Sequence, residues 1–289
     1  MNGRGKGKSR RDDGWKRLND MWEKSKSGDA IRAKEIMVYY HATGRQVFQG
    51  SVELKNVPGA LAGVSGELAR SGINLVATES WNMNSTGLAE WGFFAEADLD
   101  WKGLDEVEKT MARAPNVVGC AFREGKDGMV VDTLHYPLRL NTGEPAMVLS
   151  RNAFAEMIQN LLGVFGSGGR VVIHQLGVAG GKESCRNLLR TFGREGLELR
   201  FPEAVSLYAA MGWGKPELAE YTVRPFSGRL IMYDSFECTG PRKGAPQSEF
   251  IRGHLEGFGQ TLVNRAVACK ETKCLSAGDP YCELRYTEK

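Results

Sequence analysis

Apolar and polar positions alternate in two stretches of the first half of the chain. Residues 48–54 and 89–97 place apolar side chains at every second position, which is the period of a strand with one buried face. Two further stretches, 61–68 and 104–111, have apolar residues at helical spacing. With "INLVATESW" and "NVVGCAF" as additional strands, the pattern predicts the β-α-β-β-α-β order of a ferredoxin-like unit.

A second unit of mixed helices and strands is expected from residue 128 onward, so the predicted class is α+β. Ser150 can cap the first of its helices. The expected helices cover residues 150–165, 203–214 and 248–264, and a further helix follows "GVAGGKES" and ends near residue 190. The expected strands cover 170–176 and 228–238, and a hairpin covers 265–287. The glycines of "GVAGGKES" lack the spacing of a phosphate loop and instead predict a tight turn with close helix packing.

Charge is concentrated at the N-terminus. The chain has 289 residues and a net charge of +3. Residues 1–17 contain seven Lys or Arg and two Asp, so they contribute +5 and the remainder contributes −2. We interpret this tail as a solvated extension that precedes a short amphipathic helix with Trp15 and Trp22 on one face, and binding to nucleic acid is disfavoured.

The predicted organisation is a tail with a short helix over 1–46, a small domain over 47–127 and a larger domain over 128–289. No apolar run reaches the roughly 18 residues of a membrane helix, and the N-terminus has no signal-peptide core. We therefore expect a cytoplasmic protein without membrane contact. A reducing compartment disfavours disulfides, which leaves metal ligation or simple burial for the six cysteines.

The strongest candidate chemistry lies in "ETKCLSAGDPYCELRY" near the C-terminus. Cys274 and Cys282 flank a seven-residue loop and can converge at its base. Two adjacent thiolates repel each other, whereas zinc neutralises them and binds sulfur strongly. From spacing alone, a metal site and two packed free thiols are equal alternatives.

Residues 47–125, with "VELKNVPGALAGVSGELARSGINL", resemble an ACT domain. The resemblance implies a regulatory module that binds an amino acid or a similar metabolite at its first strand-to-helix loop. Asn56, Pro58, Gly59 and Asn74 would edge that site. Without the resemblance, a simple turn is the better explanation of residues 56–59.

The C-terminal run resembles the 4-vinyl reductase domain, whose fold is similar to that of vesicle-tethering adaptor subunits. The resemblance covers most of 130–289 and rests on the following residues: Gly253, Gly257, Glu271, Cys274, Gly278, Asp279 and Cys282. It implies zinc ligation by Glu271, Cys274 and Cys282.

A fourth ligand is expected from the same resemblance, but Ser248 stands where the family's further cysteine would be. Cys238 is the predicted substitute, ahead of His254 and Cys269. Glu271 would share a face with Cys269 on an ideal strand, so the predicted ligand set requires a local bend.

The resemblance also implies a pocket for a hydrophobic or aromatic molecule. Candidate lining residues are His174, Tyr208, Trp213 and Phe236, although each also suits an ordinary core.

These expectations together predict a homodimeric ligand-sensing regulator in which an amino-acid-type effector and a hydrophobic ligand influence each other through linkage. A partner protein or the basic tail would carry its output. No residue is assigned a catalytic role, so a non-enzyme is favoured. The alternatives are an enzyme or accessory factor in tetrapyrrole vinyl reduction, and a protein-interaction adaptor.

Overall fold

The computed structural model describes residues 34–83, 86–98, 100–239 and 244–289, and the chain divides into two compact units at residues 138 and 139. The expected basic tail and the helix around Trp15 lie outside the described residues. Both units combine helices with antiparallel sheets, which confirms the predicted α+β class. Among the described residues, no helix combines the length and the apolar character needed to cross a bilayer.

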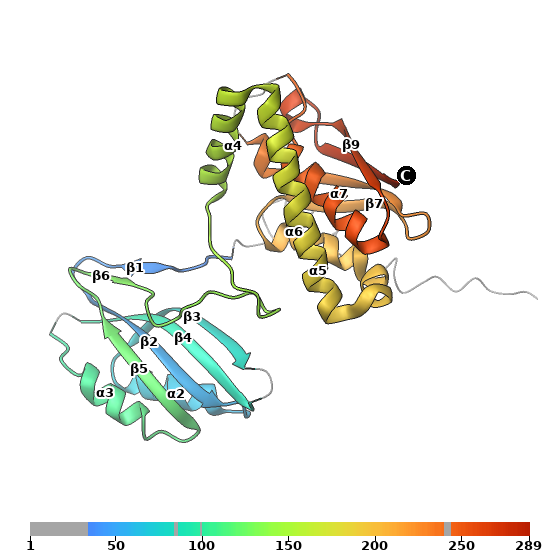
Figure 1. The fold of residues 1–289 in the computed structure, drawn as a ribbon. Coiled ribbons are helices and arrows are strands. Elements are labelled where there is room, and N and C mark those ends of the chain that lie inside the picture. The colour runs from blue at the N-terminus through green and yellow to red at the C-terminus, as the bar shows by residue number, and fades with distance from the viewer. Residues whose placement is uncertain (1–33, 84–85, 99, 240–243) are drawn as a thin grey trace, which may run out of the picture. The chain divides into compact units, whose positions relative to one another are not determined.

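The N-terminal unit is built on a four-stranded antiparallel sheet with the order β3-β4-β2-β5 (Figure 1). Its elements are β2 (Gln46–Lys55), α2 (Ala60–Arg70), β3 (Asn74–Met83), β4 (Leu88–Ala97), α3 (Leu104–Met111) and β5 (Val117–Glu124). This order and pairing form the ferredoxin-like arrangement that the sequence predicts. The alternation is confirmed as well, because Val52 and Trp91 belong to the same core as Val64 of α2 and Met111 of α3.

Helix α2 ends at a left-handed glycine. Gly72 has φ 76°, its N–H donates to the Ala69 carbonyl at 3.1 Å, and the Ile73 N–H donates to the Leu68 carbonyl at 3.1 Å. This pair of bonds is the Schellman motif, and it turns the chain from α2 into β3.

A two-stranded ribbon covers part of the second face of this sheet. It pairs β1 (Tyr39–His41) with β6 (Met129–Val131), and Val130 packs on Val47 and Phe94. Sequence analysis missed β1, which lies in the stretch assigned to the tail. The ribbon explains why Phe94, on the face expected to be polar, is buried.

The C-terminal unit contains a second antiparallel sheet with the order β7-β8-β10-β9. Its strands are β7 (Lys215–Thr222), β8 (Ser227–Tyr233), β9 (Val267–Lys273) and β10 (Cys282–Glu288). Its helices are α4 (Arg151–Phe165), α5 (Ser167–Val205), α6 (Leu207–Ala210) and α7 (Glu249–Val263), with the 3-10 turns η1 (Phe236–Cys238) and η2 (Leu275–Ala277). The core joins Leu284 of β10 and Leu230 of β8 to Leu255 of α7 and Phe201 of α5.

The strand expected over 170–176 is instead part of α5. A Cβ on Gly177 would lie 2.2 Å from the Phe250 carbonyl oxygen, and one on Gly181 would lie 2.0 Å from that of His254, so α5 packs directly on the backbone of α7. This close packing overrides the strand preference of Val171 and Val172. The glycines of "GVAGGKES" therefore permit helix packing as expected, but within a helix rather than at a turn.

Two other elements differ from the expected ones, and α5 is interrupted once. The helix predicted over 203–214 is split between the end of α5 and α6, and the strand predicted over 228–238 ends at Tyr233 and continues into η1. Gly193, with φ 66°, interrupts the helical geometry of α5. The Ser150 cap, helix α7 and the terminal hairpin agree with the sequence, and the Ser150 hydroxyl accepts the Ala153 N–H at 3.2 Å.

Candidate functional site

The turn between β9 and β10 brings Cys274 and Cys282 together. The Cys274 N–H donates to the Asp279 carboxylate at 2.8 Å, and Gly278 takes a left-handed conformation with φ 106° at the end of η2. The Leu275 N–H points to the Cys282 sulfur at 3.4 Å. Gly and Asp of the "GDP" sequence therefore close the loop and place both thiols at its base.

Cys238 reaches the same place from η1. Its Sγ lies 3.5 Å from Sγ of Cys274 and 3.5 Å from Sγ of Cys282, and all three ligand atoms lie within 4.8 Å of one another. Cys274 and Cys282 are fully buried, and Cys238 is half-buried. The structure thus unites the two cysteines of the motif with the one predicted as a substitute ligand.

Glu271 and Ser248 lie beside the three sulfurs. Glu271 accepts hydrogen bonds from the Ser248 hydroxyl at 2.7 Å and from its backbone N–H at 3.1 Å. Ser248 Oγ is itself 3.9 Å from Sγ of Cys238. Ser248 therefore does occupy the edge of the cluster, as its alignment with the family's cysteine predicts.

The bend that Glu271 requires is present in β9. Glu283 of β10 pairs with Lys273, whereas the next residue, Leu284, pairs with Glu271, so Thr272 is an extra residue in β9. Such a bulge shifts the side-chain alternation by one position. As a result, Glu271 and Cys274 face the same side, and the Glu271 carboxyl interacts with the Cys274 thiol.

Electrostatics in the cluster are dominated by burial and by contacts among the thiols. Burial raises the pKa of the Glu271 carboxyl to about 8. The thiols of Cys238 and Cys282 donate to the Cys274 sulfur and lower the pKa of that group, while the contact with Cys274 raises the pKa of Cys238 to about 12. The arrangement therefore stabilises a single thiolate, and a cation would be needed to stabilise more.

The donor set fits a divalent metal ion. In a tetrahedral site with metal–sulfur bonds of about 2.3 Å, two sulfurs lie about 3.8 Å apart, close to the separation seen here. Three sulfurs fill three vertices, and the Glu271 carboxylate or a water can fill the fourth. Glu271, His254 and Cys269 are not members of the group of ligand atoms within 4.8 Å of one another, so the Glu271 carboxyl would have to move toward the sulfurs to complete the site.

Sequence analysis missed Glu237, the neighbour of Cys238. This carboxylate is buried and accepts the N–H groups of Phe250 at 2.7 Å and Ile251 at 2.8 Å, in the first turn of α7. Burial raises its pKa to about 8. Because η1 carries Cys238 and Glu237 side by side, it is fastened to the start of α7 as well as to the cysteine cluster.

The predicted hydrophobic lining residues are only partly brought together. Trp213 lies with its ring centroid 5.6 Å from that of Tyr208 and 6.0 Å from that of Phe236, within an aromatic group that also contains Phe250. His174 instead pairs with Glu256 at 3.1 Å between α5 and α7. These rings pack against one another, and Phe236 is only 1% exposed.

The four residues predicted to edge the ACT-type site do not meet within one chain. Asn56 follows β2 where that strand pairs with Leu88 of β4, whereas Asn74 pairs with Glu96 of the same strand. Eight positions of a strand span about 26 Å, so these residues lie at opposite ends of the sheet. Pro58 and Gly59 are exposed beside Asn56, and Asn74 donates to Glu96 at 3.1 Å.

Comparison with known proteins assigns one segment of this chain to a family. Residues 229–288 match the V4R domain, which confirms the resemblance of the C-terminal region to the 4-vinyl reductase domain. This segment contains all three clustered cysteines. No curated protein matches the sequence of the chain.

Three solved structures match part of this chain. The phenol-responsive sensory domain of the transcription activator PoxR with phenol is 18% identical, with 50% of this chain and 78% of that chain covered and a TM-score of 0.43. A trafficking protein particle complex subunit 3 from Naegleria fowleri, covalently bound to palmitic acid, is 13% identical, with coverages of 48% and 92% and a TM-score of 0.37. A vinyl-4-reductase family protein from Methanocaldococcus jannaschii is 16% identical, with coverages of 50% and 98% and a TM-score of 0.30.

Proposed function

We propose that this protein is a ligand-sensing regulator whose C-terminal unit is held together by a structural zinc ion. The observation that carries the proposal is the meeting of Cys238, Cys274 and Cys282 within 4.8 Å inside the V4R segment. Zinc would join η1 to the loop between β9 and β10, with Glu271 as the fourth ligand. The ion supplies a cross-link and no chemistry at a substrate.

The sensing role rests on the position of the cluster beside the aromatic group. Phe236 and Cys238 belong to the same short turn, so a ligand that separates the rings around Phe236 would also move a metal ligand. Trp213 is fixed to this turn because its carbonyl accepts the Phe236 N–H at 2.9 Å. A hydrophobic ligand and the metal are therefore coupled through η1, and ligand binding would favour one of two arrangements.

The ACT-like N-terminal unit would bind an amino-acid-type effector at the exposed loop that contains Asn56, Pro58 and Gly59. Gly59 takes a left-handed conformation with φ 86° directly before α2. No atom lies within 4 Å of the position that its Cβ would occupy, so the loop is open to a ligand there. Asn74 belongs to the opposite end of the sheet, so only a second copy could bring it to this loop. We propose a homodimer for this reason. We also propose that the protein is cytoplasmic and that a partner protein receives the signal.

The metal content of the protein tests the central proposal. We expect about one zinc per chain by elemental mass spectrometry when the protein is purified without chelator or metal-affinity resin. The substitutions Cys238→Ser and Cys274→Ser should each remove most of it. Cys120→Ser, in the N-terminal unit, is the matched control and should retain it. Absence of metal from the wild type would leave three buried thiols and refute the zinc-stabilised module.

The packing of the aromatic group favours an adaptor as the second candidate function. Its rings lie 5 to 6 Å apart and fill the space between α6, η1 and α7. Calorimetric titration of the zinc-loaded protein with phenol and with palmitate separates the two functions. Saturable binding that Trp213→Ala alters supports the sensor, whereas the absence of binding to either probe supports the adaptor.

A further inference from the structure

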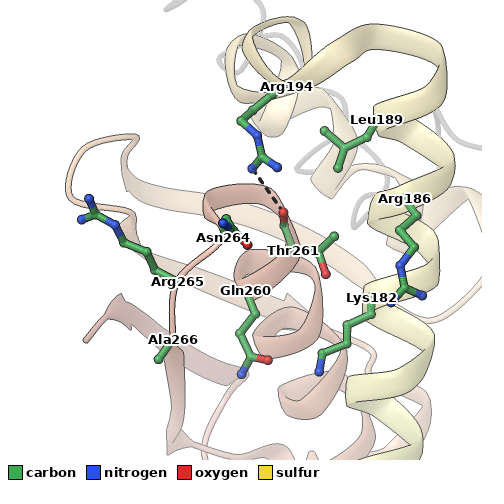
Figure 2. Close-up of a pocket in the computed structure, with 9 residues that line it drawn as sticks. All are labelled: Lys182, Arg186, Leu189, Arg194, Gln260, Thr261, Asn264, Arg265 and Ala266. Atoms are coloured by element: carbon green, nitrogen blue, oxygen red, sulfur yellow. Dashed lines mark hydrogen bonds between the residues drawn. The ribbon is translucent and has the colours of Figure 1, made fainter.

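A basic hollow lies on the surface between the middle of α5 and the C-terminal end of α7 (Figure 2). It is a shallow, open depression with a volume of about 690 Å³, so a ligand there would stay largely exposed to solvent. None of the residues that line it is acidic, and four are cations, namely Lys182, Arg186, Arg194 and Arg265. The hollow shares no residue with the cysteine cluster or with the aromatic group.

The cations are held in place but not fully neutralised. Arg186 pairs with Glu183 at 2.9 Å, and Arg265 pairs with Glu288, yet the two arginine side chains remain 55% and 71% exposed. Neither carboxylate lines the hollow. Exposed ion pairs such as that of Arg186 are weak, so its guanidinium group can engage an anion that enters, whereas Figure 2 shows the Arg265 side chain turned away from Lys182 and Arg186.

The sequence of α5 adds to this positive charge. Lys182, Arg186 and Arg190 follow one another at intervals of four residues and therefore lie along one face of the helix. Glu183 is shared, because it pairs with both Arg186 and Arg190. Like charges at this spacing destabilise a helix. Glu183 offsets only part of the repulsion among these cations, and a bound anion would offset more of it.

Arg194 reduces the negative potential that the C-terminal end of α7 would otherwise add to the hollow. The C-terminal end of a helix carries partial negative charge on its free carbonyl groups. Arg194 donates to the Thr261 carbonyl at 3.2 Å and so offsets that charge at the edge of the hollow. Figure 2 shows this bond, and it also shows Lys182 extending from α5 beside the Gln260 side chain of α7.

We propose that this hollow binds a small organic phosphate. Guanidinium groups bind phosphate oxygens through paired hydrogen bonds, Lys182 adds a point charge, and the Gln260 amide adds a neutral donor. Leu189 and Ala266 provide apolar contact for the organic part of the ligand. No aromatic side chain lines the hollow, so it lacks the stacking surface with which proteins bind single-stranded nucleic acid.

Calorimetric titration of the full chain with inorganic pyrophosphate at low salt tests the proposal. We expect saturable binding that is at least tenfold weaker in the double variant Lys182→Gln/Arg186→Gln. Arg200→Gln is the matched control, because Arg200 lies exposed on α5 outside the hollow and donates to the Gly196 carbonyl. Its affinity should equal that of the wild type, and thermal unfolding verifies that all three proteins are folded.

Three results would overturn the proposal. One is the absence of pyrophosphate binding at millimolar concentration, and another is equal weakening by Arg200→Gln, which would mean non-specific attraction to a basic surface. The third is tighter binding of a short single-stranded DNA than of pyrophosphate, with the same dependence on Lys182 and Arg186. That result would assign the hollow to nucleic acid instead.

Discussion

His254 is a buried histidine whose two ring nitrogens each contact a hydroxyl group rather than a carboxylate. Its Nδ1 lies 3.0 Å from the Tyr208 hydroxyl, and its Nε2 lies 3.2 Å from the Ser184 hydroxyl. Burial lowers the pKa of the His254 imidazole to about 4. At pH values between this pKa and the ordinary value of 6.5, the imidazole is therefore neutral in the folded protein and protonated in the unfolded chain.

This depressed pKa predicts that the contribution of His254 to stability falls in mild acid, whereas Glu237 and Glu271, with pKa values raised to about 8, favour the folded state as the pH falls. Between an unfolded pKa near 6.5 and a folded pKa of about 4, only the unfolded state takes up the proton, so acidification favours unfolding. From pH 7.5 to pH 5 the contribution of His254 amounts to roughly 2 kcal/mol. Urea denaturation at the two pH values measures it. His254→Gln should be less stable at neutral pH but should lose less stability on acidification, and an equal loss in both proteins would refute the assignment.

Ser248 provides a test of the metal centre at the level of one atom. Its hydroxyl already lies 3.9 Å from the Cys238 sulfur, so Ser248→Cys would place a fourth thiol at the cluster. Zinc prefers thiolate to carboxylate or water, and we expect a tenfold or greater gain in zinc affinity by competition with a chromophoric chelator. Ser65→Cys in α2 is the control for an added thiol. Unchanged affinity of Ser248→Cys would mean that Ser248 does not face the metal.

How far the site could be predicted differs from residue to residue. Cys274 and Cys282 are recognisable from their spacing, because a hairpin loop of seven residues closes on itself. Cys238 lies far from them in sequence. It became a candidate only because the family pattern implies a further cysteine ligand and this chain has a serine at that position. Glu237 gave no signal, because its role depends on the free N–H groups of a helix that begins twelve residues later.

At the scale of elements, the packing of α5 on α7 depends on absent side chains. Gly177 and Gly181 of α5 contact the α7 backbone, and Gly253 and Gly257 of α7 contact that of α5 in return. A Cβ on Gly253 would lie 2.1 Å from the His174 carbonyl oxygen. Because backbone atoms on both sides form the contact, neither helix can yield by a change of rotamer.

Gly181→Ala should therefore destabilise the C-terminal unit by roughly 1 to 3 kcal/mol, the usual range for overpacking. Gly180→Ala is a close control on the same helix, because its Cβ would meet only the His254 ring at 3.8 Å. That variant should be neutral or more stable by up to about 1 kcal/mol, since alanine favours helix over glycine. Urea denaturation compares them, and similar effects of the two substitutions would contradict the packing argument.

The same contact explains which elements could be predicted. In the N-terminal unit each strand packs largely through its own alternating residues, so local pattern and final structure agree. Residues 170–176 have the β-branched composition of a strand, but Gly177 and Gly181 favour a helix there through contacts with residues some seventy positions away. A pattern read locally does not contain that information.

At the scale of the whole molecule, the outer surface of α4 is apolar. Met157, Val164 and Phe165 are 53%, 73% and 60% exposed, and they line a hollow of about 500 Å³ along the helix. Val171 of the neighbouring α5 is also 62% exposed. Such a contiguous apolar surface on a folded unit is typical of a surface that another protein covers.

We expect a second copy of this chain to cover α4, because its exposed apolar side chains can pack on identical ones about a two-fold axis, although Glu156 and Asn160 also line this hollow. The double substitution Val164→Glu/Phe165→Glu should convert the dimer to a monomer, since each interface would then bring four carboxylates together. Leu199→Glu, at a position with 53% exposure on α5, is the control and should remain dimeric. Sedimentation velocity measures the outcome. A wild-type monomer at micromolar concentration, or an unchanged dimer in the double variant, would exclude α4 as the dimer interface.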